Sequence, residues 1–174
     1  MEKTLAVLNR MQADGIINRY AIGGAIAATR YIEPFHTSDI DVFVFLPFST
    51  SGLVSISPIY TYLGRLGYEA QGEYINVEGW PVQFLPVYNS LSEEALSHAV
   101  EVNFGSTPTR VLSAEHLAAI MLETGRPKDY ARLVQFIESD ALDISKLHDI
   151  LARNGLLTKW DSFHRKFIKE KEQS

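Results

Sequence analysis

The chain has 174 residues and contains no cysteine. Disulfide bonds, thiolate nucleophiles and cysteine-ligated zinc sites are therefore excluded. No apolar stretch approaches the roughly 18 residues that a membrane-spanning helix needs. The first residues, MEKTLAVLNRMQADG, also lack the basic segment and the long apolar run of a secretory signal. We therefore expect a cytoplasmic protein without a membrane partner.

Positive charge is scarce in the first two thirds of the chain. Residues 1–110 carry 6 Lys and Arg against 11 Asp and Glu, whereas residues 111–174 carry 10 of each kind. The net charge of -5 argues against nucleic-acid binding through a broad basic surface. Most cations lie in the last third, where they can face the acidic part or a polyanionic ligand.

The pattern of apolar residues predicts an α/β (α+β) protein with a mixed β-sheet flanked by helices and a C-terminal helical part. We expect a core at residues 1–110 and a helical subdomain at 111–174 packed on it. In the core we expect helices at 1–16, 24–32, 58–66 and 90–100, strands at 18–24 and 36–47, a hairpin at 69–89 turning at Glu78-Gly79, and a short strand with a loop at 101–112. The subdomain has capped helices at 113–125, 126–139, 143–155 and 157–174.

Two aspartates open the most apolar strand of the chain. Residues 42–46, Val-Phe-Val-Phe-Leu, read as a strand buried on both faces. Asp39 and Asp41 precede this run and are two positions apart, so a strand points both carboxylates to one face and Ile40 to the other. Such a pair can share a proton or bind a hard cation such as Mg²⁺. The alternative is a solvated polar end of the strand.

A glycine pair separates an apolar strand from an alanine-rich helix. Glycine lets the backbone approach a phosphate closely, and a helix N-terminus supplies free N–H groups. Gly23 and Gly24 therefore indicate a phosphate site. The alternative is a tight turn between strand and helix that binds no ligand.

The order of these parts resembles the nucleotidyltransferase superfamily, whose palm is of the DNA polymerase β type. The signature stands here as IGG and SDIDVFVF, and the resemblance covers residues 18 to about 90. It implies that Asp39 and Asp41 bind Mg²⁺ or Mn²⁺ and act in catalysis. It also implies that Gly23, Gly24 and Ser38 hold the phosphates of a nucleoside triphosphate. The 14 residues between Gly24 and Asp39 make a slightly long spacer for the family.

A second segment, TGRPKDYARLVQFIES, resembles the abortive-infection toxin branch of small bacterial nucleotidyltransferases. The resemblance implies that Lys128 meets phosphate near the active site, with Arg126 and Asp129 beside it. The alternative is an ordinary helix start, since Pro127 suits a first turn and Asp129 suits the helix dipole.

The chain departs from the family at the third carboxylate. The corresponding strand is WPVQFLPV, and the expected position holds Gln83. Its amide oxygen can still contact a metal or nucleotide, but an amide brings no charge and cannot act as a general base. Glu73 and Glu78 lie on the same hairpin outside the expected pattern, and Glu73 reaches the site only if the strand register differs by one position.

These patterns lead to three hypotheses. In the first, the protein transfers a nucleotidyl group from a nucleoside triphosphate to a hydroxyl of RNA, protein or a small molecule, and Lys128 neutralises developing charge. In the second, Gln83 marks a degenerate member that binds a nucleotide or a partner protein without turnover, as in a toxin–antitoxin-like pair. In the third, the motifs are vestigial and the chain is a structural module.

Overall fold

A computed structural model describes residues 1–34, 37–47 and 55–169 of the chain. Two compact units make up the structure. The first lies within Met1–Ala27 and Phe35–Leu112, and the second within Ala28–Pro34 and Ser113–Ser174. Among the described residues, no helix combines the length and the apolar character that crossing a membrane requires.

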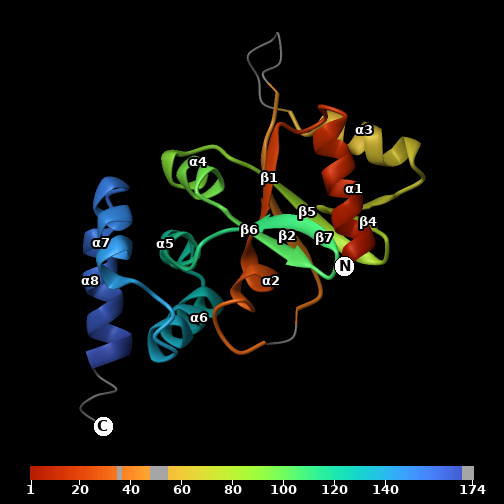
Figure 1. Cartoon of the computed structure of the whole chain (residues 1–174). Coiled ribbons are helices and arrows are strands. Elements are labelled where there is room, and N and C mark those ends of the chain that lie inside the picture. The colour runs from red at the N-terminus through yellow and green to blue at the C-terminus, as the bar shows by residue number, and fades with distance from the viewer. Residues whose placement is uncertain (35–36, 48–54, 170–174) are drawn as a thin grey trace. The chain divides into compact units, whose positions relative to one another are not determined.

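The first unit is built on a mixed sheet of seven strands in the order β3-β4-β5-β2-β1-β7-β6 (Figure 1). Strand β2 is central, because it pairs antiparallel with β1 and parallel with β5. In chain order the elements are α1 (Glu2–Ala13), β1 (Arg19–Ile22), α2 (Gly24–Ala28), β2 (Ile40–Phe45), α3 (Ser57–Arg65), β3 (Ala70–Gln71), β4 (Tyr74–Val77), β5 (Trp80–Pro86), α4 (Ser90–Ser97), β6 (Val100–Phe104) and β7 (Thr107–Val111).

The two faces of β2 differ in burial. Ile40, Val42 and Val44 are fully buried, whereas the alternate positions are only half-buried. Val44 pairs with Tyr20 of β1, and the Tyr20 hydroxyl reaches Asn9 of α1, so α1 covers this face. Asp41 therefore lies on the more open face. The expectation of a strand buried equally on both faces was wrong, because the second face is incompletely covered.

Several predicted elements of the core are confirmed, including α1, α3 and the β4–β5 hairpin. At the turn of that hairpin, Glu78 has φ 53° and Gly79 has φ 84°, which is typical of a two-residue hairpin loop. Two details differ. Helix α2 has only five residues, and the segment at 101–112 is a complete β6–β7 hairpin. The side chain of Asn89 caps helix α4.

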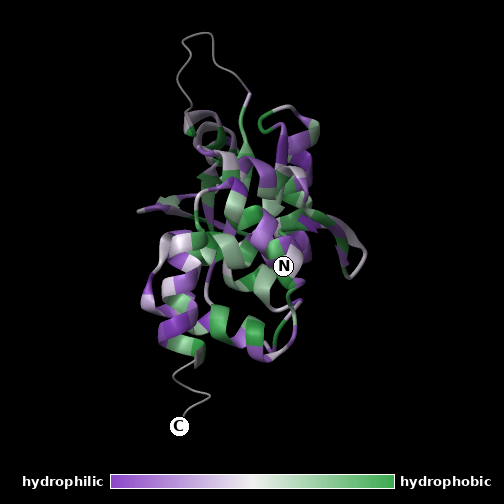
Figure 2. Ribbon diagram, turned by 90° about the vertical axis from the view of Figure 1, so that its left-hand side faces the viewer, coloured by the Kyte–Doolittle hydropathy of each residue, from purple (hydrophilic) through white to green (hydrophobic). Residues whose placement is uncertain are grey.

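The second unit consists of helices, as the sequence predicts. They are α5 (Ala114–Thr124), α6 (Pro127–Glu138), α7 (Ile144–Arg153), α8 (Leu157–His164) and a terminal π-helical turn, η1 (Arg165–Lys169). The side chain of Ser113 caps α5, and Gly125 ends it in the left-handed conformation that glycine favours. Helix α5 contacts both α6 and α7, and Leu117, Phe136 and Leu147 lie in this core. The helices carry hydrophilic and hydrophobic residues together (Figure 2), as amphipathic helices do.

Candidate functional site

The glycine corner contacts the second aspartate directly. The Gly23 N–H donates to the Asp41 carbonyl oxygen at 2.8 Å, which extends the β1–β2 ladder by one residue beyond the pair of Ile22 and Val42. Gly24 follows with φ 53°, a left-handed conformation that L-residues rarely adopt. A Cβ atom built on Gly24 would overlap the Asp41 carboxylate. The structure thus places a carboxylate against bare backbone where β1 ends.

The two glycines serve different purposes. Gly23 is buried, and a Cβ atom there would overlap the ring of Phe43. Packing alone therefore requires glycine at this position. At Gly24 the neighbouring group is the charged carboxylate of Asp41, which is half-buried on the open face. The candidate site therefore requires glycine at position 24, whereas packing requires it at position 23.

Asp39 lies one residue before β2, which begins at Ile40. Its side chain is half-buried, and the Thr37 hydroxyl donates to Asp39 Oδ1 at 3.2 Å. Ser38 between them is exposed. Ile40 is fully buried, so the chain alternates between apolar core and acidic surface from Asp39 to Asp41. This alternation separates the carboxylates from the core while Ile40 anchors the strand.

Strand β5 carries Gln83 at the position where the resemblance expects a third carboxylate. Gln83 is the partner of Asp41 in the parallel β2–β5 ladder, so the two side chains share a face. The Gln83 Nε2 atom donates to Glu73 Oε2 at 2.9 Å. Glu73 lies in the turn between β3 and β4, an element that sequence reasoning missed. The residue in the sequence that could have indicated this turn is Gly72, which has φ 63°.

The pKa of the Tyr74 hydroxyl depends on the charges of the same region. Desolvation raises the pKa of the Tyr74 hydroxyl above its usual value, and the negative charges of Glu73, Asp39 and Asp41 raise this pKa further. The field around this phenol is negative, which favours a cation there.

The donor set suits a divalent cation together with phosphates. Two half-buried carboxylates offer the hard oxygen ligands that Mg²⁺ or Mn²⁺ prefers, and Mg²⁺ completes its shell with water and phosphate oxygens. The backbone at Gly24 has no side chain, so the Asp41 carboxylate packs directly against it. Helix α2 has five residues, so the corner offers bare backbone and not the dipole of the longer helix that the sequence predicts.

The predicted cationic segment belongs to the second unit. Asp129 is only 2% exposed, and Arg126 Nε lies 2.6 Å from Asp129 Oδ2. The backbone N–H of Arg126 donates to the same oxygen at 3.3 Å. These contacts favour the interpretation of this pair as a helix start. Lys128 is exposed in the first turn of α6, and its role in phosphate binding stays a prediction.

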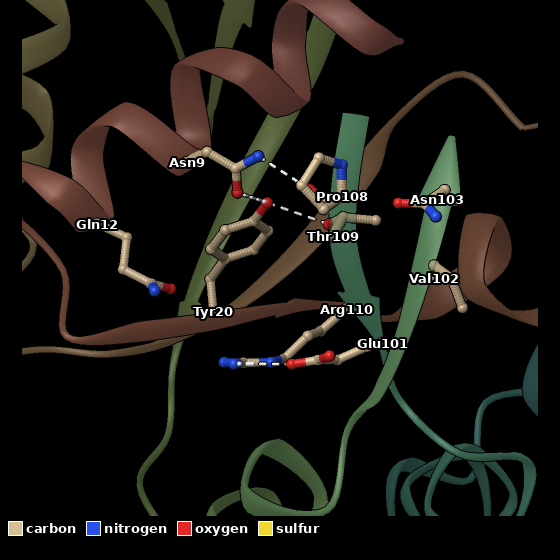
Figure 3. A pocket seen from close by; sticks show the side chains of 9 residues that line it. All are labelled: Asn9, Gln12, Tyr20, Glu101, Val102, Asn103, Pro108, Thr109 and Arg110. Carbon is tan, nitrogen blue, oxygen red and sulfur yellow. Dashed lines mark hydrogen bonds and ion pairs between the residues drawn. The ribbon is translucent and has the colours of Figure 1, made fainter. Parts of the chain in front are cut away.

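A pocket of about 290 Å³ opens elsewhere on the first unit (Figure 3). The Tyr20 hydroxyl donates to Asn9 Oδ1 at 2.7 Å and lies 3.0 Å from Thr109 Oγ1. Arg110 and Glu101 form an ion pair of 3.3 Å at its side. Tyr20 shares a face of the sheet with Val44, whereas Asp41 occupies the other face. None of the candidate site residues predicted from the sequence lines this pocket.

Comparisons with known proteins identify the fold. No protein-family model matches the chain, and no curated protein matches it. An antigenic nucleotidyltransferase-like protein from Paracoccidioides brasiliensis is similar in structure, with a TM-score of 0.53, 15% identity, and coverage of 92% of this chain and 89% of that one.

Two structures of ANT(2'')-Ia are also similar. One is a complex with adenylyl-2''-tobramycin, with a TM-score of 0.51, 16% identity, and coverage of 87% of this chain and 92% of that one. The other is a solution structure of this antibiotic-resistance factor, with a TM-score of 0.51, 13% identity, and coverage of 95% and 99%. The chain thus has a nucleotidyltransferase fold, which confirms the predicted mixed α/β architecture.

Proposed function

We propose that the protein binds a nucleoside triphosphate with Mg²⁺ or Mn²⁺ and transfers the nucleotidyl group to a hydroxyl. The observation that carries this proposal is the glycine corner at Gly24, closed against the Asp41 carboxylate on the open face of a nucleotidyltransferase fold. A tight turn without a ligand does not need a carboxylate at that position. A cation site next to phosphates needs a carboxylate there.

Each residue has a distinct part in this proposal. Asp39 and Asp41 hold the divalent ion, and the turn at Gly23 and Gly24 holds the triphosphate, as the resemblance implies. The exposed Ser38 hydroxyl can donate to a phosphate oxygen. When bound, the ion offsets the negative charge of the phosphates. Phosphate binding by Lys128 is inferred from the resemblance alone.

The reaction class is an in-line displacement at phosphorus. The acceptor oxygen forms a bond to the α-phosphorus, the bond from this phosphorus to the pyrophosphate oxygen breaks so that pyrophosphate leaves, and the acceptor hydroxyl gives up its proton to water. RNA, a protein or a small molecule can supply the hydroxyl. The adenylylated tobramycin bound by ANT(2'')-Ia supports a small-molecule acceptor as the first to test.

One observation favours a second candidate function. The strand position beside Asp41 holds the uncharged Gln83, so the strand supplies no third acid for a second metal or for proton removal. In this alternative the protein binds the nucleotide, or a partner protein in a toxin–antitoxin-like pair, without turnover.

The deciding experiment incubates the full chain with nucleoside triphosphates labelled at the α-phosphate, Mg²⁺ or Mn²⁺, and candidate acceptors. Label transfer that Asp41→Asn abolishes, and that the exposed control Asp149→Asn retains, supports the enzyme. A rise in melting temperature with Mg²⁺-nucleotide but no transfer supports the binding module. No response to either metal or nucleotide contradicts both and favours a structural role.

A further inference from the structure

Strand β6 forms one edge of the seven-stranded sheet. Within the described ranges of the chain, β7 is the only strand that pairs with it. The opposite edge, β3, has two residues, whereas β6 has five and contains neither lysine nor proline. Short strands, lysine and proline are common means by which a sheet edge avoids pairing with another chain. The β6 edge therefore stays able to pair with a further strand.

The register of the β6–β7 hairpin determines which backbone groups of β6 point to the edge. Asn103 pairs with Pro108, which has no N–H, so these two residues do not exchange backbone hydrogen bonds. Hydrogen-bonded and non-hydrogen-bonded pairs alternate along an antiparallel ladder, so the pair of Glu101 and Arg110 is also of the non-hydrogen-bonded type. The N–H and C=O groups of Glu101 and Asn103 therefore point away from β7, toward the edge.

The side chains of β6 alternate between polar and apolar. Glu101 and Asn103 are exposed on one face of the strand, and Val102 lies on the other (Figure 3). Val100 and Phe104 share the face of Val102; Val100 is 38% exposed, and the other two are half-buried. The edge thus presents a partly exposed apolar row on one face and an acid next to an amide on the other.

We propose that two copies of this chain associate through their β6 strands, which pair antiparallel about a two-fold axis at Val102. In this register Glu101 of each copy lies opposite Asn103 of the other copy, and each such pair exchanges both backbone hydrogen bonds. The Asn103 amide can donate to the Glu101 carboxylate across the pair. Val102 meets Val102 of the second copy, and Val100 meets Phe104, so the apolar row continues across the axis. Such an interface is isologous and closes as a dimer.

Charge favours this register over its neighbours. Because both strands must bring their outward-facing groups to the new ladder, the neighbouring symmetric registers place Glu101 opposite Glu101 or Asn103 opposite Asn103. The first sets like charges directly opposite each other, which is destabilising. The second places Glu101 opposite Gly105, so the carboxylate has no amide partner and a glycine enters the ladder. The register centred on Val102 is the one that pairs both polar side chains, and it does not depend on nucleotide binding.

Sedimentation equilibrium of the full chain, at concentrations up to about 0.5 mM, measures the association. The weight-average mass should rise with concentration from 19.5 kDa toward twice that value. A contact between two short strands is small, so the dimer should dissociate reversibly on dilution. A chain that stays monomeric over this range overturns the proposed dimer and leaves an extended segment of another protein as the occupant of the edge. Growth beyond a dimer also overturns it, because a two-fold pair closes.

The absence of cysteine from the chain allows a direct test of the register. In Val102→Cys the two thiols face each other in a non-hydrogen-bonded pair, with Cα atoms about 4.5 Å apart, which suits a disulfide. In Glu101→Cys and in Asn103→Cys the two identical positions are diagonal, about 7–8 Å apart, which exceeds the usual Cα separation of a disulfide. Mild oxidation should therefore give a covalent dimer of Val102→Cys and little of the other two.

The control for random collisions is Asp149→Cys, at an exposed position in the second unit. It should cross-link no faster than Glu101→Cys. Faster cross-linking of Glu101→Cys or Asn103→Cys than of Val102→Cys would overturn the proposed register.

Two charge variants at one exposed position test the pairing of Asn103 with Glu101. Asn103→Lys places an ammonium group opposite the Glu101 carboxylate and should tighten the dimer, whereas Asn103→Glu places like charges opposite each other and should weaken it. Each pair occurs twice in the symmetric dimer, so the dissociation constants should change about two- to thirtyfold, in opposite directions. The unfolding temperature should change little, because the position is exposed. Changes of the same sign in both variants would contradict the pairing.

Discussion

Replacing Gly24 by alanine tests the geometry on which the candidate site depends. Gly24 has φ 53°, and its missing Cβ is the space that the Asp41 carboxylate occupies. Forcing an L-residue into the left-handed region costs roughly 1–2 kcal/mol. Crowding a packed position adds about 1–3 kcal/mol, since neighbours must shift. The Gly24→Ala variant should therefore lose more stability than its backbone conformation alone requires, and Asp41 should be displaced.

Gly15→Ala is the matched control for this experiment. Gly15 belongs to the same unit and has φ 71°, but a Cβ atom there would meet nothing within 4 Å. Gly15→Ala therefore has the conformational cost of a left-handed alanine but no steric overlap of its Cβ atom. In a chain of this size, each kcal/mol lowers Tm by about 2–4 °C, so urea and thermal unfolding resolve the difference between the two variants.

The cation readout completes this prediction. Gly24→Ala should lose the Mn²⁺ binding that depends on Asp41, whereas Gly15→Ala should keep it. Equal stability losses in the two variants, together with unchanged Mn²⁺ binding in Gly24→Ala, would refute the assignment of the glycine corner to the site.

Two other predictions concern the surroundings of the site. Asp129→Ala should lower the free energy of unfolding by about 1–3 kcal/mol, because it leaves the start of α6 without its buried hydrogen-bond acceptor. Lys128→Ala should change the free energy of unfolding by no more than about 0.5 kcal/mol. Equal losses for the two variants in urea unfolding would contradict the structural assignment of Asp129. Burial raises the pKa of Tyr20, although the hydrogen bond with Thr109 and the charge of Arg110 partly oppose it. Because the unfolded chain then ionises first, stability should fall as the pH rises above about 10. Tyr20→Phe should reduce this loss of stability at alkaline pH and should lower stability at neutral pH. Unfolding midpoints measured between about pH 8 and 11 report both effects. If the pH dependence of stability above about pH 10 is unchanged in Tyr20→Phe, the proposed ionisation of Tyr20 is wrong.

The predicted and the missed elements differ in the strength of their local patterns. Strand β2 has a long apolar run, and α5 has both a serine cap and a glycine end, so local chemistry suffices to predict them. Strand β3 has two exposed residues and no periodicity at all. The β6–β7 hairpin is mostly exposed along β6, so it lacks the clear alternation that identifies a half-buried strand.

The sequence by itself determined the chemistry and order of the site: a glycine pair after one strand, and Asp39 and Asp41 at the start of the next. It also showed that the strand expected to carry a third acid has Gln83 instead. Only the tertiary structure decided which groups meet. Parallel pairing of β2 with β5 sets Gln83 beside Asp41, and the short β3–β4 turn brings Glu73 to Gln83. The physical reason is that strand register depends on pairing between distant segments and on turn geometry, which residue spacing along one segment does not specify.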